Sequence, residues 1–321
     1  MAPQTKPELW TILAVLRWSA AFFQSHGIDA ARNTAEMLLA HALKLQKIDL
    51  YLRYDQPLAP QELAAYKMLI KRRLDAEPVA YILGAKSFWK QTLEVSRDVL
   101  IPRPETEHLV ETALQGLPAS GGDGPWRVLD LGTGSGAVVL ALAAERPGHL
   151  FFASDRSVQA LKIARANAVR NGLGEQIRFL CGHWLQPFGA GRFFFDLIVS
   201  NPPYIPTSEI SRLAPEIRCY EPLQALDGGP DGLEAIGSIV RAAGAFLKPR
   251  GHLLLEIGYD QQNAVEQLAR TAGGYAHIEF FRDYAGHPRV ARLTRGENHR
   301  APAGALSGAH AAFSETTQQK S

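Results

Sequence analysis

The stretch Val128-Leu129-Asp130-Leu131-Gly132-Thr133-Gly134-Ser135-Gly136 decides the fold of this chain. Apolar residues typical of a buried strand lead into three alternating glycines, and an apolar, helix-like segment follows. Because glycine has no Cβ, it permits a tight turn and lets a ligand approach the backbone closely. The first N–H groups of the following helix are expected to be free for that ligand. The pattern predicts a strand, a ligand-binding turn and a helix, the first unit of an α/β domain.

Strand-like and helix-like segments alternate after Trp126. Strands are predicted at Arg127–Leu131, Leu150–Ala153, Ile177–Leu180, Phe194–Ser200, His252–Ile257, Ile278–Phe281 and Val290–Leu293. Helices are predicted at Gly136–Glu145, Val158–Val169, Leu233–Leu247 and Gln261–Ala272. This order predicts a Rossmann-like, mostly parallel seven-stranded sheet that binds its ligand at the carboxyl ends of the strands. A short connection, Asp283–Pro288, joins the last two strands, which should therefore pair antiparallel.

The rest of the chain divides into three further parts. Residues 1–77 carry apolar residues at helical spacing and predict a small helical bundle. Residues 78–103 form a linker with a short β-hairpin, in which Phe88-Trp89 and Leu93-Glu94-Val95 flank Lys90-Gln91-Thr92. The α/β domain then covers residues 104–295. Residues 296–321 are rich in Ala, Gly, Ser, Thr and Gln, which predicts a disordered tail.

Composition narrows the classes of function. The 321 residues have a net charge of only +2, so a dedicated nucleic-acid-binding surface is not expected. The two cysteines, Cys181 and Cys219, exclude a disulfide framework, and the ten histidines show no metal-ligand spacing. No apolar run is long enough for a membrane span, and the amino terminus lacks a signal-peptide pattern. We expect a cytoplasmic monomer without a metal.

The glycine loop alone leaves its ligand open, since Gly132, Gly134 and Ala137 also satisfy the loose dinucleotide pattern. Asp155 ends the next predicted strand, where a carboxylate can bind both ribose hydroxyls. It could equally cap the helix that begins near Ser157, and both roles could coexist. Asp130 favours a nucleoside sulfonium over a dinucleotide, because a pyrophosphate would be repelled by this acid while an ammonium would be attracted.

A second motif, Asn201-Pro202-Pro203-Tyr204, directly follows the strand Phe195–Ser200. The two prolines fix the backbone and remove two N–H donors, which leaves nearby carbonyls free. A planar NH2 group could donate to the Asn201 side-chain oxygen and the Pro202 carbonyl while stacking on Tyr204. Both acceptors would bind more tightly as the nitrogen gains positive charge. The alternative is a rigid Asn-Pro turn without a catalytic role.

With both motifs in place, residues 7 to 295 resemble the HemK/PrmC family of glutamine methyltransferases. The most specific shared motifs are Glu77-Pro78-Val79-Ala80-Tyr81-Ile82-Leu83-Gly84, Leu100-Ile101-Pro102-Arg103-Pro104-Glu105-Thr106-Glu107, Asn201-Pro202-Pro203-Tyr204-Ile205-Pro206 and the segment from Glu221-Pro222 to Leu226-Asp227-Gly228-Gly229-Pro230-Asp231-Gly232-Leu233. The resemblance implies methylation of the side-chain amide nitrogen, N5, of the glutamine in the Gly-Gly-Gln motif of release factors 1 and 2. S-adenosylmethionine is the implied methyl donor.

The resemblance also implies a set of site residues. S-adenosylmethionine would contact Gly132, Thr133, Gly134, Ser135, Gly136, Asp155, Trp184 and Asn201. The substrate glutamine would bind at Asn201, Pro202, Pro203 and Tyr204, with Asn201, Pro202 and Tyr204 acting in catalysis. Arg103 and Glu105 would shape the mouth of the pocket or form a salt bridge at a helix start. The amino-terminal helices would dock the release factor.

Two other functions compete with this interpretation. A nucleic-acid methyltransferase acting on adenine N6 or guanine N2 would use the same planar-amine geometry on a flipped base. Such an enzyme should carry a basic face or a large insertion, and the sequence has neither. A non-catalytic nucleotide-binding protein would be expected to lose Asn201-Pro202-Pro203-Tyr204, which this chain retains.

Overall fold

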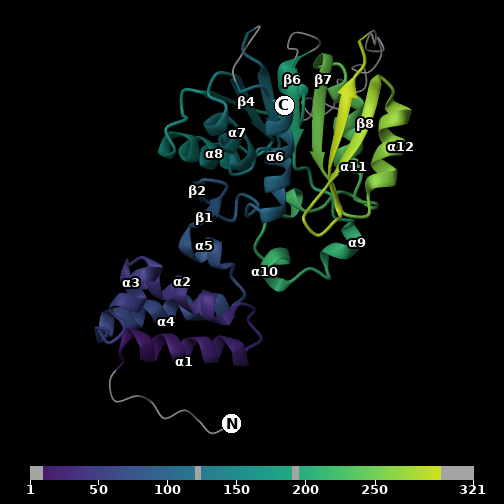
Figure 1. Cartoon of the computed structure of the whole chain (residues 1–321). Helices are drawn as coiled ribbons and strands as arrows, with labels where there is room; N and C mark the ends of the chain where they lie inside the picture. Colours follow the sequence, from purple (N-terminus) through teal and green to yellow (C-terminus); the bar gives the residue numbers. More distant parts are fainter. Residues whose placement is uncertain (1–9, 120–123, 190–194, 298–321) are drawn as a thin grey trace, which may run out of the picture. The chain divides into compact units, whose positions relative to one another are not determined.

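A computed structural model describes residues 10–119, 124–189 and 195–297 (Figure 1). They form two compact units. One comprises the residues up to Lys86 together with Ala214–Tyr220, and the other comprises Ser87–Leu213 and the residues from Glu221 on. Across the described ranges, no helix is long and apolar enough to cross a membrane. Most of the predicted tail, residues 298–321, lies outside the described residues, as does Phe194, the first residue of a predicted strand.

The first unit is helical, as predicted. Its helices are α1 (Ile12–Ser25), α2 (Ala31–Leu43), α3 (Lys47–Leu52), α4 (Pro60–Leu74), α5 (Val79–Leu83) and α10 (Pro215–Arg218). The Thr11 side chain caps α1 by accepting from the Ala14 N–H, and Pro60 begins α4, where a missing N–H costs nothing. Leu16, Leu38 and Ile70 belong to the core that these helices enclose. Burial of such apolar faces stabilises the short helices, which would be marginal alone.

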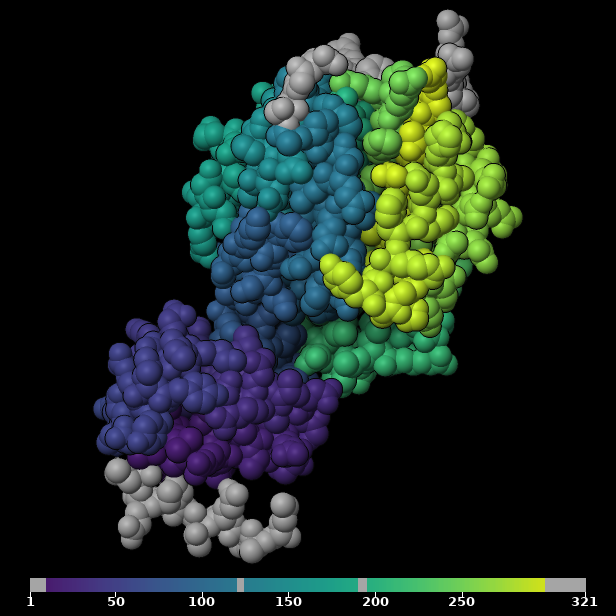
Figure 2. All heavy atoms as spheres, viewed as in Figure 1, coloured from purple at the N-terminus to yellow at the C-terminus, as the bar shows by residue number. Residues whose placement is uncertain are grey.

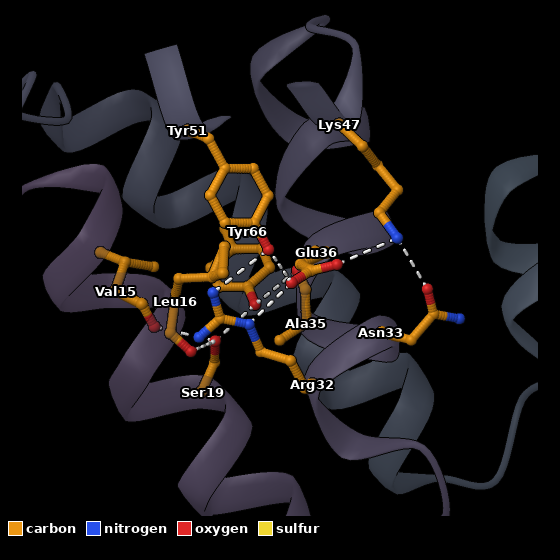
Figure 3. A network of polar contacts seen from close by, with 10 residues as sticks. All are labelled: Val15, Leu16, Ser19, Arg32, Asn33, Ala35, Glu36, Lys47, Tyr51 and Tyr66. Carbon is orange, nitrogen blue, oxygen red and sulfur yellow. Dashed lines mark hydrogen bonds and ion pairs between the residues drawn. The ribbon is translucent and has the colours of Figure 1, made fainter. Parts of the chain in front are cut away.

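A polar network around the buried Glu36 connects the helices of this unit (Figure 3). Glu36 accepts hydrogen bonds from Arg32 at 2.7 Å and from the Tyr51 hydroxyl, and it pairs with Lys47 at 2.9 Å. Burial alone would raise the pKa of Glu36, but these three partners outweigh it and lower the pKa to about 2. The carboxylate therefore joins α2 to α3 as an ionised group.

The second unit is built on a seven-stranded sheet. Its strands are β3 (Arg127–Leu131), β4 (Leu150–Asp155), β5 (Ile177–Cys181), β6 (Phe195–Ser200), β7 (Leu247–Glu256), β8 (Tyr275–Arg282) and β9 (Pro288–Arg295). Their spatial order is β5-β4-β3-β6-β7-β9-β8. All neighbours pair parallel except β9, which is antiparallel to both β7 and β8. The predicted Rossmann-like sheet and its antiparallel last pair are confirmed. The predicted hairpin is also present, as β1 (Ala85–Phe88) and β2 (Gln91–Glu94).

Helices cover both faces of the sheet. On one face, α6 (Glu107–Gly116), α7 (Ala137–Glu145) and α8 (Val158–Arg170) share a core with Val128, and on the other, α11 (Glu234–Ala243) and α12 (Gln262–Ala272) share a core with Leu129. Consecutive residues of β3 thus face opposite cores, as the alternation of side chains in a strand requires. Shorter helical turns are η1 (Pro104–Thr106), η2 (Gln186–Phe188), α9 (Thr207–Ile210) and η3 (Leu223–Ala225).

In the second unit, the predicted end of one helix was wrong, and one contact between distant elements was not predicted. The helix predicted to run to Leu247 ends at Ala243, because Leu247 already pairs with Phe195 in the sheet. The β8–β9 connection extends to α6, where the yellow and blue surfaces meet in Figure 2. There the Tyr284 hydroxyl donates to Glu111 Oε1 at 3.0 Å.

Candidate active site

The glycine loop lies between the end of β3 and the start of α7. Gly132, Gly134 and Gly136 have φ values of +71°, +55° and +85°, a backbone region that favours glycine. The N–H groups of Gly132 and Thr133 donate to the Ser154 carbonyl at 2.8 and 3.0 Å. These bonds attach the loop to the end of β4.

The loop uses several of its own N–H groups internally, and at the start of the following helix, where free N–H groups were predicted, that of Val139 is engaged as well. The Gly134 N–H donates to Asp155 Oδ2 at 2.9 Å, and the Gly136 N–H donates to the Thr133 carbonyl at 2.8 Å. In the first turn of α7, the Val139 N–H donates to Asp130 Oδ2 at 3.3 Å. Asp155 and Asp130 accept from Gly134 and Val139 because the loop folds back on the ends of the two strands. These N–H groups therefore shape the loop.

Asp130 is an internal support of this loop. Its side chain is 2% exposed, and its Oδ2 accepts from the Thr133 hydroxyl at 2.7 Å as well as from Val139. Burial raises the pKa of Asp130 to about 7, although the two hydrogen bonds oppose that rise. The sequence prediction, that this acid would face a ligand's ammonium or water, is supplemented by a role in capping α7.

Asp155 lies opposite the loop at the end of β4. Its Oδ2 accepts from Gly134 and its Oδ1 accepts from the Ser157 N–H at 2.8 Å. The cap of α8 is Ser157 itself, whose hydroxyl accepts from the Ala160 N–H at 3.1 Å. Burial raises the pKa of Asp155, and the backbone N–H groups of Ser157 and Gly134 partly offset this effect.

A cavity of about 820 Å³ opens along these carboxyl ends of the strands. Its lining includes most of the predicted site residues, namely Gly132, Thr133, Gly134, Ser135, Asp155, Trp184, Asn201 and Pro203, and also Asp130, Arg103 and Thr106. Gly136, Pro202, Tyr204 and Glu105 are not among the lining residues. The structure thus brings the glycine loop and the start of the acceptor loop to one cavity.

Trp184 forms one wall of this cavity. Its backbone has a φ of +48°, and a Cβ on Gly132 would lie 3.3 Å from the Trp184 ring. The ring also packs against the core that contains Leu129. The Trp184 ring therefore both lines the cavity and packs on the core.

The acceptor loop, Asn201-Pro202-Pro203-Tyr204, is held by side chains from other elements. Asn201 Nδ2 donates to Thr106 Oγ1 at 3.0 Å, and the Tyr204 hydroxyl donates to Glu256 Oε1 at 3.2 Å. Pro202 is buried, and the Tyr204 ring packs against the core under β6. Because Nδ2 of Asn201 is engaged by Thr106, its Oδ1 is the atom available as an acceptor.

Glycines and a glutamine support the backbone of the acceptor loop. A Cβ on Gly228 would lie 2.8 Å from the Pro203 carbonyl oxygen. Gln261 Nε2 donates to the Tyr204 carbonyl at 3.0 Å and to the Gly232 carbonyl at 3.1 Å. The segment around residues 226–233 therefore serves as a close-fitting support, a role that its sequence did not disclose.

Arg103 forms an ion pair at the rim of the cavity. Its Nη2 lies 2.5 Å from Oε1 of Glu221, whose side chain is 1% exposed, and Glu221 Oε2 accepts from the Ile101 N–H at 3.1 Å. The helix-start salt bridge between Arg103 and Glu105 is not formed, since Glu105 is exposed and Arg103 pairs with Glu221 instead. This pair attaches the segment after residue 220 to the cavity rim.

Several supporting residues were missed by reasoning from the sequence. Thr106 belongs to a shared motif in which its residue type indicates no role, and neither Glu256 nor Gln261 belongs to a motif. Glu256 did carry a signal, because it is an acid inside the apolar run Leu253–Ile257. In the described parts of the chain, no group of three or more His, Cys, Asp or Glu residues is placed to hold a metal ion.

The charges of the cavity favour a cationic ligand. Asp130 and Asp155 both line it, and burial raises the pKa of both carboxyls. A positive group bound nearby would restore the ionised forms and gain binding free energy from them. Asn201, which also lines the cavity, adds a neutral acceptor suited to an N–H donor.

Comparison with known proteins gives matches over both units. The family model described as PrmC N-terminal domain matches residues 14–84, and the methyltransferase small domain model matches residues 112–216. The chain is 44% identical over 268 residues to the release factor glutamine methyltransferase of Geobacter sulfurreducens, with 84% of this chain and 91% of the relative covered. It is 40% identical over 282 residues to the protein of the same name from Caulobacter vibrioides, with coverages of 87% and 96%.

A solved structure resembles the fold. The hMettl16 catalytic domain, solved in complex with MAT2A 3′UTR hairpin 6, aligns with a TM-score of 0.51 and 16% sequence identity. The alignment covers 76% of this chain and 84% of that chain. At this identity the likeness concerns the fold alone.

Proposed function

This chain belongs to the release factor glutamine methyltransferase family, and on that premise we propose that it methylates glutamine N5 in the Gly-Gly-Gln motif of class I release factors. The chain is a methyltransferase. The observation that carries the choice of acceptor is the side chain of Asn201, which reaches the cavity with its Nδ2 engaged by Thr106 and its Oδ1 left to accept.

S-adenosylmethionine fits the cavity and, when bound, supplies an electrophilic methyl group attached to a positively charged sulfur. Asp155 is placed to accept from ribose hydroxyls, since each of its oxygens has one backbone donor and a carboxylate oxygen can accept more than one. Trp184 offers a flat apolar wall for a base. Asp130 and Asp155 supply the negative charge that a sulfonium and an ammonium favour.

The acceptor loop positions the glutamine amide. One amide N–H donates to Asn201 Oδ1, and the Pro202 carbonyl takes the second. An amide nitrogen is a poor nucleophile because its lone pair is delocalised, so orientation and charge stabilisation have to lower the barrier. Both acceptors gain strength as positive charge develops on the nitrogen. Asn201 is neutral and does not remove the proton, which leaves after methyl transfer.

The helical unit is the proposed docking surface for the protein substrate. It is a separate compact body whose exposed apolar side chains include Ile48, Leu52 and Met68. Such side chains are suited to bury area against a partner. We propose release factors 1 and 2 as the partners, a cytoplasmic location and a monomeric enzyme.

The experiment that tests this function offers several acceptors to one enzyme preparation. Purified protein with methyl-labelled S-adenosylmethionine is incubated with a release factor, with its Gly-Gly-Gln glutamine-to-alanine variant, with DNA and with ribosomal RNA. We expect label on the intact release factor alone. Label on nucleic acid would favour exocyclic-amine methylation, and undiminished label on the alanine variant would refute the proposed target residue.

A further inference from the structure

A buried carboxylate lies behind the acceptor loop. Glu256, at the end of β7, is 1% exposed, and its Oε1 accepts from the Tyr204 hydroxyl. Its Oε2 is shielded from solvent and accepts no hydrogen bond from the described residues. The Thr106 hydroxyl is a neighbouring donor, and its interaction with the carboxylate lowers the pKa of Glu256 against the rise caused by burial. A buried carboxylate oxygen without a donor is costly, so the Thr106 proton is drawn toward Glu256.

The direction of this single proton determines the orientation of Asn201. A threonine hydroxyl has one hydrogen to donate and two lone pairs with which to accept. With its hydrogen directed at Glu256, Thr106 Oγ1 can only accept from Asn201, and it does so from Nδ2 at 3.0 Å. The planar amide of Asn201 must then turn Oδ1 away from Thr106. In the opposite orientation, Nδ2 would face the glutamine amide, placing one donor against another.

We propose that Thr106 and Glu256 are positioning residues that hold the Asn201 amide with Oδ1 toward the acceptor nitrogen. This inference rests on the proposed function, because it concerns the same acceptor site. Thr106 lines the cavity but Glu256 does not, so the carboxylate acts on the substrate through two intervening side chains. It also holds Tyr204, and it thus anchors both polar side chains of the acceptor loop.

The first test removes the Thr106 hydroxyl and then restores it. Thr106→Val keeps the shape of the side chain, and we expect it to lower kcat for release-factor methylation by about tenfold to a hundredfold. The dissociation constant for S-adenosylmethionine should change by less than about threefold, because an orienting defect acts on the transition state. Thr106→Ser should recover most of the lost rate. Thr112→Val is the matched control, since it removes a buried hydroxyl that bonds within α6 to the His108 carbonyl, and its kcat should equal that of the wild type.

The second test asks whether the two residues act through one path. Glu256→Leu removes the carboxylate, and the double variant Thr106→Val/Glu256→Leu should have a kcat within about twofold of Glu256→Leu alone. A double variant that loses the product of both single effects would contradict a shared path. If Glu256→Leu does not fold, as judged by its thermal transition, the Thr106 variants decide the question. Wild-type kcat in a folded Thr106→Val would overturn the proposal.

A readout without turnover separates this inference from the proposed function. In ¹⁵N-labelled protein, the Asn201 side-chain NH2 signals should shift and exchange faster with solvent in Thr106→Val than in the wild type or in Thr112→Val. Unchanged Asn201 signals would contradict the positioning role. If the Asn201 signals change as expected but the protein methylates no release factor, the positioning role of Thr106 stands and the proposed substrate is refuted.

Discussion

Gly232 lies directly against the backbone of Tyr204, so that a Cβ at position 232 would be 2.4 Å from the Tyr204 carbonyl oxygen. No Cβ tolerates that distance, and the same oxygen accepts a hydrogen bond from Gln261 Nε2, which a Cβ at position 232 would also meet at 2.8 Å. The φ of Gly232, +75°, adds a second reason for glycine. The last residue of the acceptor loop is therefore seated against a glycine turn that follows it by 28 residues.

We predict that Gly232→Ala displaces the acceptor loop and lowers kcat by about tenfold or more, because a shift on the order of 1 Å misplaces the acceptor groups. Steady-state methylation of a release factor measures this effect. Gly172→Ala is the control, since Gly172 has a φ of +73° with nothing near its would-be Cβ. Both variants should lose on the order of 1 kcal/mol of stability from backbone strain. Equal kcat in the two variants would show that the contact with Tyr204 is unimportant.

We expect Asn201→Ala to lower kcat by about a hundredfold or more, since it removes an acceptor that strengthens in the transition state. Binding of S-adenosylmethionine, measured by calorimetry, should largely survive because the glycine loop and Asp155 remain. Asn171→Ala, at the end of α8, serves as the control. Normal turnover of Asn201→Ala would remove this residue from the mechanism.

Trp184→Ala should weaken S-adenosylmethionine binding by about tenfold, as expected for the loss of one aromatic wall of the cavity. Trp184→Phe should retain most of the affinity. The measurement is the dissociation constant at equilibrium. Unaltered affinity in the alanine variant would assign Trp184 to the core alone.

The lowered pKa of Glu36 leads us to predict that the helical unit loses stability in acid. Its pKa is lowered in the folded state to about 2, so its contribution to stability is complete above the unfolded pKa near 4.5 and is lost as the pH falls toward 2. Glu36→Gln should reduce the free energy of unfolding at pH 7 by about 1 kcal/mol, since its partners are half exposed and solvent screens the pairs, and should flatten the pH dependence below pH 4.5. Urea unfolding followed by circular dichroism at several pH values measures both effects.

The control for Glu36 is Glu266→Gln. Glu266 pairs with Arg270 on the exposed face of α12, where an ion pair contributes little to stability. A loss of stability in Glu266→Gln as large as that in Glu36→Gln would contradict a special role for the buried network.

Those parts of the fold and the site that are formed by contiguous residues could be predicted from the sequence. The strand, glycine turn and helix around Gly132–Gly136 and the acceptor loop after Ser200 follow from contiguous residues. The supporting contacts could not be predicted, because they join distant positions. Asn201 and Thr106 are 95 residues apart, and Tyr204 and Glu256 are 52 apart.

The sequence also could not predict which acceptors the backbone N–H groups near the glycine loop bond to. The N–H groups at the start of α7 were expected to be free for a ligand, yet Asp130 accepts from Val139 there, and Asp155 accepts from Gly134 in the loop. Competition of this kind depends on which carboxylate oxygens come within about 3 Å, and only the folded backbone fixes that. The end of α11 was mispredicted for a related reason, since pairing with Phe195 drew Leu247 into the sheet.

The inclusion of Ala214–Tyr220 in the helical unit has a consequence for biosynthesis. Arg73 pairs with Glu216 at 2.5 Å, and the Tyr220 hydroxyl donates to the Asp75 carbonyl at 2.7 Å. These partners lie 143 and 145 residues apart. A nascent chain emerges from its amino end, so the helices can form early but gain these contacts only after the strands β3 to β6 have been translated. The helical unit, although its own helices precede the sheet in the sequence, is therefore complete only after residues 214–220 have been translated.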